Sequence, residues 1–165
     1  MRTGAGLKEL PDRGVYTLVI YIENPLEVKV GSLDTLDFRA GFYLYTGSGM
    51  GSSGLKGRIK RHLGGRKHVF WHIDYLLEKP GVSIKSVVAS GSRVRMECEV
   101  NKALMASLRA YAPFRGFGSS DCRSGCPAHL LFAGEEDPTD RVVAVYLSLG
   151  LKPVLLEVER ELEGP

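Results

Sequence analysis

Two stretches of the chain are apolar at almost every position, and they predict buried strands. The first is GVYTLVIYIE, residues 14–23, and the second is GFYLYTG, residues 41–47. Both are rich in β-branched and aromatic residues without a polar alternation, a pattern that is typical of strands buried on both faces. Between them, EVKVG and TLDFRAG carry regular polar positions and predict a short hairpin with a polar face. Two further strands are predicted for VSIKSVVASG and HLLFAG.

Other segments repeat their apolar residues at helical spacing. Leu55, Ile59 and Leu63 recur every four residues and predict one apolar stripe on a helix. Helices are also predicted for VFWHIDYLLEK, for RVRMECEVNKALMASL and for DPTDRVVAVYLSLGLKP, the last of which is capped by Gly150. The order of elements predicts an α+β fold, in which helices flank a small, mostly antiparallel central sheet with an inserted β-hairpin and a C-terminal helical extension. The length fits a single domain, residues 1–165.

The overall composition is that of an ordinary globular protein, with 44% apolar and 25% charged residues and a net charge of +3. No apolar run approaches the roughly 20 residues that span a bilayer, and the first residues lack the apolar core of a signal peptide. We therefore expect a cytoplasmic protein without a membrane partner. In that compartment the cysteines should be reduced or metal-bound rather than disulfide-paired: Cys98, Cys122 and Cys126.

Basic residues are concentrated in one segment. Residues 54–68 contain six Lys or Arg and two His without any acid, whereas residues 135–163 contain eight acids against three bases. A concentrated basic segment can attract phosphate, although most such runs are a solvated helix face.

The basic segment follows a glycine-rich run, in which Gly49, Gly51 and Gly54 have the G-x-G-x-x-G spacing of a dinucleotide-binding turn and Asp74 lies twenty residues further on. A dinucleotide fold would also need a buried helix within a parallel βαβ unit. Here the helix has only a narrow apolar stripe, and hairpin material separates the first two strands. No nucleotide cofactor is therefore expected. The run either needs positive φ in a loop or presents backbone amides that suit contact with a phosphodiester.

Two tripeptides lie on the predicted core strands: Gly14-Val15-Tyr16 and Tyr45-Thr46-Gly47. With Arg58 on the next helix and Glu99 on a later one, they resemble the GIY-YIG nuclease superfamily. Four longer blocks are similar, in the same order, to its Uri-type endonuclease branch: YTGSGMGSSGLKGRIKRHL, FWHIDYLL, ECEVNKAL and GFGSSDC…HL. The resemblance covers residues 14–132 as a GIY-YIG-like core and leaves residues 133–165 as a C-terminal extension.

The chain departs from the superfamily pattern in three places. The 28 residues between Tyr16 and Tyr45 exceed the usual short spacing, and the extra hairpin accounts for them. Valine and threonine replace the two isoleucines, at positions that serve packing. The asparagine that usually follows the catalytic glutamate has no clear counterpart, which leaves open how phosphate or metal would be positioned.

The resemblance implies an endonuclease that hydrolyses phosphodiester bonds in DNA with a divalent metal, Mg²⁺ or Mn²⁺. It implies Glu99 as the metal ligand, with Glu97 as the fallback, and Arg58 as the group that neutralises the phosphate. Tyr16 and Tyr45 would orient water and phosphate, and Tyr16 could accept the water's proton if nearby cations lowered its pKa from about 10. His62 would share the phosphate or assist proton transfer. The expected catalytic set is Tyr16, Tyr45, Arg58, His62 and Glu99.

Nucleic acid, with DNA the first choice, is the expected partner. Basic residues would bind its backbone: Lys56, Lys60, Arg61, Arg66 and Lys67. The alternative function is a catalytically inactive nucleic-acid-binding module of the same fold. The sequence leaves open the shape and sequence of the substrate, the choice between DNA and RNA, and the oligomeric state.

Two further groups could hold a metal ion. One lies on the predicted second helix and consists of His68, His72 and Asp74, although Trp71 and Tyr75 indicate that this helix packs on the core. The other offers soft ligands in a loop, Cys122, Cys126 and His129, at a spacing that matches no common zinc module. The resemblance also includes three polar residues that would line the site without an assigned role: Ser119, Ser120 and Asp121.

Overall fold

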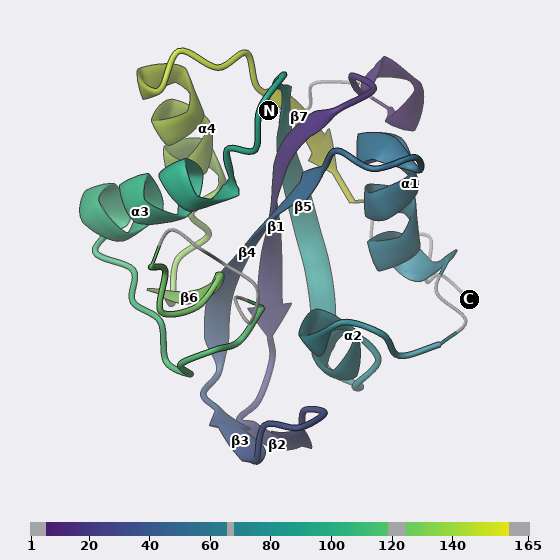
Figure 1. Ribbon diagram of the computed structural model, residues 1–165. Helices are drawn as coiled ribbons and strands as arrows, with labels where there is room; N and C mark the ends of the chain where they lie inside the picture. The colour runs from purple at the N-terminus through teal and green to yellow at the C-terminus, as the bar shows by residue number, and fades with distance from the viewer. Residues whose placement is uncertain (1–5, 66–67, 119–124, 159–165) are drawn as a thin grey trace.

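The computed structural model describes residues 6–65, 68–118 and 125–158. Within these ranges, five antiparallel strands form one sheet in the order β6-β4-β1-β5-β7. The strands are β1 (Gly14–Ile22), β4 (Gly41–Gly49), β5 (Val82–Gly91), β6 (Leu130–Gly134) and β7 (Val154–Glu157). Strand β1 lies at the centre with β4 and β5 on its two sides (Figure 1). The two apolar runs pair antiparallel with each other, in agreement with the mostly antiparallel sheet predicted from the sequence.

Helices cover both faces of the sheet, so the molecule has three layers (Figure 1). On one face lie α1 (Gly54–Lys60), a wide turn η2 (Arg61–Gly65) and α2 (His72–Leu77); on the other lie α3 (Glu97–Leu108) and α4 (Thr139–Ser148). A short 3₁₀ turn, η1 (Leu7–Glu9), precedes β1. Alternate residues of β1 enter the two cores: Tyr16 and Leu18 face α1 and α2, whereas Val15 and Val19 face α3 and α4. This double burial explains why residues 14–23 are apolar at nearly every position.

Two glycines allow close approach in the centre of the sheet. Tyr16 on β1 lies opposite Gly47 on β4. A Cβ atom on Gly47 would lie 2.6 Å from the Tyr16 hydroxyl oxygen, and one on Gly14 would lie 1.9 Å from the carbonyl oxygen of Ser90. Neither position has room for a side chain. The glycine of each tripeptide is therefore required by packing.

The predicted hairpin is confirmed: β2 (Leu26–Lys29) pairs with β3 (Thr35–Phe38) in a small sheet of its own. The predicted second helix is shorter than expected, because the backbone of Trp71 is extended (φ −101°, ψ 160°) and the helix begins only at His72. The Asp74 carboxylate accepts hydrogen bonds from the amides of Phe70 and Trp71, which fixes this start.

The C-terminal segment contains the expected helix, α4, which ends before Gly150 (φ 79°). It also contains a strand that the sequence analysis did not predict, because β7 returns beside β5 and extends the sheet. In the part of the chain described by the structure, no helix is long and apolar enough to cross a bilayer.

Candidate functional site

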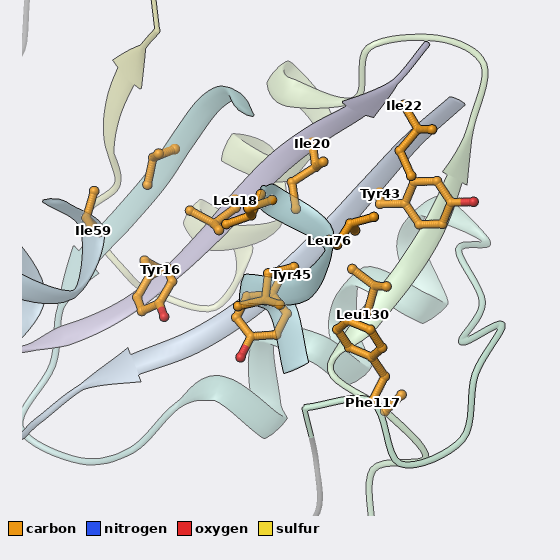
Figure 2. Packing of buried hydrophobic residues seen from close by; sticks show 14 of the residues in the cluster. Tyr16, Leu18, Ile20, Ile22, Tyr43, Tyr45, Ile59, Leu76, Phe117 and Leu130 are labelled. Atoms are coloured by element: carbon orange, nitrogen blue, oxygen red, sulfur yellow. The ribbon is translucent and has the colours of Figure 1, made fainter. Parts of the chain in front are cut away.

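Three ring-bearing side chains meet on the α1 side of the sheet, near the start of β1 and the end of β4. The Tyr16 hydroxyl oxygen lies 2.7 Å from Nε2 of His62. The centroid of the His62 ring lies 5.4 Å from that of Tyr16 and 6.0 Å from that of Tyr45. Both tyrosine rings project to the same side of the sheet (Figure 2). Tyr16 and Tyr45, two members of the expected catalytic set, thus lie on the same face of the sheet.

Burial changes the expected chemistry of Tyr16, whose side chain is only 1% exposed. Removal from water raises the pKa of Tyr16 well above its ordinary value of 10.0, Tyr45 adds to the rise, and the charge of Arg58 offsets only part of it. The condition under which Tyr16 could accept a proton from water, a pKa lowered by nearby cations, is therefore not met. The phenol is neutral, and its hydroxyl forms a hydrogen bond with Nε2 of His62.

His62 takes the buried position that the sequence pattern predicted for Leu63. Leu55 and Ile59 are fully buried as predicted, but Leu63 is 37% exposed and His62 only 2%. Helix α1 is followed by the wider π-helical turn of η2, in which Gly64 has a non-helical backbone (φ 135°). The four-residue spacing of an α-helix therefore does not extend to Leu63.

Arg58 lies between the end of β4 and the ring of Trp71. Its Nη1 donates to the carbonyl oxygen of Ser48, and its Cζ lies 4.3 Å from the centroid of the Trp71 ring. The same indole ring lies beside His62, with the centroids 5.9 Å apart. The partly exposed guanidinium is thus held by a carbonyl and by an aromatic face. Trp71 connects Arg58 with the Tyr16–His62 pair, a role that its spacing on the predicted helix did not indicate.

The two candidate carboxylates of α3 lie in different surroundings. Glu97 is partly buried, accepts a hydrogen bond from the Ser48 hydroxyl, and has one carboxylate oxygen 3.6 Å from Nη1 of Arg95. Glu99 is exposed. Because Arg58 binds the carbonyl of the same Ser48, Glu97 is the carboxylate that the structure connects to Arg58.

Arg61 was expected to contact DNA, and the structure gives it a different role. Its Nη2 lies 2.6 Å from Oδ2 of Asp74 and donates to the carbonyl oxygen of His68 at 3.0 Å. Its Cζ lies 4.6 Å from the centroid of the Trp71 ring. The side chain of Arg61 is 24% exposed and that of Asp74 is fully buried. This guanidinium therefore neutralises a buried carboxylate at the start of α2.

The carboxylate of Asp74 has further donors around it. Burial on its own would raise the pKa of Asp74, but hydrogen bonds from the amides of Trp71 and Phe70 and from Arg61 outweigh it and lower that pKa. Asp74 is thus ionised, and its carboxylate is bound by Arg61 and by the amides of Phe70 and Trp71. It does not form a metal site with the nearby histidines. His68 is exposed, and Nδ1 of His72 accepts a hydrogen bond from the amide of Gly118 at 2.9 Å. Burial lowers the pKa of His72, consistent with this acceptor role.

A cleft of about 730 Å³ opens beside the glycine-rich run. It is lined by residues 51–54 and by the cations Arg13, Lys56 and Arg93, with Asp12 as an acidic neighbour. Gly54 has the positive φ (67°) expected for this run. Of the other predicted DNA contacts, Lys60 is exposed on α1, and Arg66 and Lys67 lie outside the described residues. Arg13 and Arg93 are cations that the sequence analysis missed, because they are remote from the basic segment along the chain.

One of the predicted loop ligand pairs meets a residue of α3. Cys126 and His129 lie close to Cys98 of α3, which the sequence analysis did not connect with them. Cys122 and the three polar residues of the same loop are outside the described residues: Ser119, Ser120 and Asp121.

The fold and this site define a class: a three-layer domain with an antiparallel central sheet and a Tyr–His–Arg cluster on one face. Over residues 15–151 the chain matches the family described as "Domain of unknown function DUF123", and it belongs to this family. The match extends from β1 to the residues just after α4, so it includes the central sheet except β7. No curated protein and no solved structure matches the chain.

Proposed function

We propose that the protein is a divalent-metal-dependent endonuclease that hydrolyses phosphodiester bonds in DNA. The observation that carries the proposal is the meeting of Tyr16, Tyr45, Arg58 and His62 at one end of the β1–β4 pair. The similarity of the motif blocks to GIY-YIG nucleases of the Uri type supports the same activity.

Arg58 is the proposed phosphate-binding residue. Its guanidinium is partly exposed, and its contacts with Ser48 and Trp71 fix its position before substrate arrives. A prepositioned guanidinium forms strong hydrogen bonds with phosphate oxygens, and it stabilises most the state in which the negative charge on them has grown. Loss of Arg58 should therefore reduce the cleavage rate more than it reduces DNA affinity.

The buried Tyr16–His62 pair holds the residues of this site in position. Since Tyr16 is 1% exposed and its hydroxyl is already bound to His62, we assign it a positioning role in place of the role of a base. His62 packs against Tyr45 and Trp71, and Trp71 in turn holds Arg58. The pair thus sets the distance between Tyr45, the proposed second contact to the phosphate, and the guanidinium.

Glu97 is the proposed ligand of the metal ion, with Glu99, which the resemblance implies, as the alternative. A carboxylate oxygen is a hard donor of the kind that Mg²⁺ and Mn²⁺ prefer, and Glu97 lies partly exposed beside the residue that binds Arg58. Such an ion, when bound, supplies positive charge at the phosphate and makes a bound water more acidic. One carboxylate would leave most coordination positions to water and phosphate.

The cleft beside the glycine-rich run is the proposed binding surface for the DNA backbone. Arg13, Lys56 and Arg93 line it, and Lys60 lies exposed on the same helix as Lys56. Contacts of this kind are independent of sequence and weaken with salt. The proposal therefore includes no base-specific recognition.

A nucleic-acid-binding module without catalysis is the rival function, and the burial of Tyr16 favours it. The two are separated by incubating the protein with single-stranded, duplex and branched DNA, in Mn²⁺, in Mg²⁺ and in excess chelator. The proposal predicts cleavage of at least one substrate that needs the metal and is lost in Arg58→Ala. Binding of all three substrates without any cleavage would support the rival, and a failure to bind any of them would exclude both.

A further inference from the structure

A second cluster of chemically active side chains contains no residue of the proposed nuclease site, although one of its members, Cys98, directly follows Glu97 in α3. It consists of Cys98, on the first turn of α3, and of Cys126 and His129, which precede β6. One ligand atom from each residue lies within 4.8 Å of the other two. In the described part of the chain this is the group of His, Cys, Asp and Glu side chains that could hold a metal ion. The separation of Cys126 and His129 from Cys98 along the sequence does not indicate that the three side chains lie close together.

The distances fit a tetrahedral ion. With bonds of about 2.3 Å to sulfur and about 2.1 Å to nitrogen, tetrahedral zinc separates a thiolate from an imidazole nitrogen by about 3.6 Å and two thiolates by about 3.8 Å. Sγ of Cys98 and Nε2 of His129 already lie 3.6 Å apart. The remaining separations, at most 4.8 Å, need a contraction of at most about 1.2 Å to reach these values. Side-chain rotation can supply a movement of this size.

The backbone around the cluster is held in place. Nδ2 of the buried Asn101, one turn along α3 from Cys98, donates to the carbonyl oxygen of Ala128 at 2.8 Å. The amide of His129 donates to the carbonyl of Phe117 at 2.8 Å, and the amide of Thr46 donates to the carbonyl of His129 at 3.2 Å. The cluster is therefore preorganised between α3 and β4. Cys126 and His129 are buried, and Cys98 is partly buried.

We propose that Cys98, Cys126 and His129 bind one zinc ion, which links α3 to the segment before β6. Two soft thiolates and an imidazole select zinc over Mg²⁺ and Mn²⁺, which prefer oxygen ligands, so this site is distinct from the one at Glu97. Binding releases the two thiol protons to solvent, and the imidazole binds as the neutral form. Three protein ligands leave a fourth position for water or another donor. The position of Cys98 at the start of α3 adds the positive end of a 12-residue helix beside its thiolate.

The test measures metal content in the full chain, purified without chelator and dialysed against zinc and then against buffer. We expect about one zinc per chain, a fall of at least tenfold in Cys98→Ser and in His129→Ala, and no change in the matched control His68→Ala, whose imidazole is exposed. Cobalt(II) substituted into the folded parent should give the intense near-ultraviolet sulfur-to-metal band and the visible bands of a tetrahedral site. Because the cobalt spectrum is measured on the parent, it tests the proposal even if a variant fails to fold. A folded parent without zinc, a parent in cobalt without a sulfur-to-metal band, or a folded Cys98→Ser that keeps its zinc would overturn the proposal.

Discussion

Replacing Arg61 by alanine should reduce the stability of the fold and leave DNA affinity nearly unchanged. The substitution removes the 2.6 Å ion pair with Asp74 and the contact with the Trp71 ring. A hydrogen bond to a charged group contributes about 1.5–3 kcal/mol, and a cation over an aromatic face about 0.5–1 kcal/mol. Asp74 keeps its bonds to the amides of Phe70 and Trp71. The expected loss in the free energy of unfolding is therefore about 2–4 kcal/mol.

Urea denaturation followed by circular dichroism measures this loss. The matched control is Lys60→Ala, the neighbouring residue, whose exposed side chain should change the free energy of unfolding by no more than about 0.5 kcal/mol. If Arg61→Ala unfolds at the same urea concentration as the control, the ion pair with Asp74 contributes nothing and the structural role of Arg61 is refuted.

The difference in the free energy of unfolding between the parent and Arg61→Ala depends on pH in a defined direction. The pKa of Asp74 is lower in the folded protein than in the unfolded chain. The stability that ionised Asp74 contributes is therefore fully present above the pKa of an Asp side chain in the unfolded chain, near 3.9. It is lost as the pH falls through the lower pKa that Asp74 has in the folded protein. The difference between parent and Arg61→Ala should be complete at neutral pH and shrink below about pH 4. A difference that grows on acidification would contradict this sign.

Three further predictions concern DNA binding, packing and the Tyr16–His62 pair. The double substitution of Lys56 and Lys60 by alanine should lower the salt dependence of DNA binding by about one slope unit per lost phosphate contact, measured by fluorescence anisotropy from low to high salt. Gly47→Ala should destabilise the fold by about 1–3 kcal/mol, because its Cβ would lie 2.6 Å from the Tyr16 hydroxyl, whereas Gly51→Ala, with no atom within 4 Å, should be nearly neutral in thermal unfolding. Tyr16→Phe should slow cleavage by about tenfold or less, as the loss of one hydrogen bond predicts; a loss of 10²–10⁴, the range typical of a catalytic base, would restore that role to Tyr16.

The sequence pattern predicted the central sheet well, because double burial leaves long apolar runs. Residues 14–23 and 41–47 are recognisable as strands from their own sequence, and they form the antiparallel pair β1–β4 of the predicted sheet. Strand β7 (Val154–Glu157) was not predicted because four residues at a sheet edge show little periodicity. These residues form a strand because they pair with β5.

The sequence predicted which residues lie together at the candidate site better than it predicted their chemical roles. The sequence analysis placed Arg58 and His62 in one expected catalytic set, but only the wide turn η2 determines that His62 enters the core. Burial depth, which no local pattern encodes, then decides that Tyr16 remains a neutral phenol. The meeting of Cys98 with Cys126 and His129 depends on where α3 packs, so the linear spacing of these residues could not reveal it.

The central claim is that the protein cleaves DNA through a metal ion held beside Arg58. Its most direct test is the single-turnover cleavage rate as a function of Mn²⁺ concentration for the parent, Glu97→Gln and Glu99→Gln, with DNA affinity and thermal unfolding measured on the same preparations. We expect the parent rate to rise with Mn²⁺ and saturate, and we expect Glu97→Gln to cleave about 10²-fold more slowly while binding DNA and melting like the parent. A folded Glu97→Gln that cleaves at the parental rate would contradict the assignment of the metal to Glu97, and a parent whose cleavage does not depend on Mn²⁺ or Mg²⁺ would contradict the central claim itself.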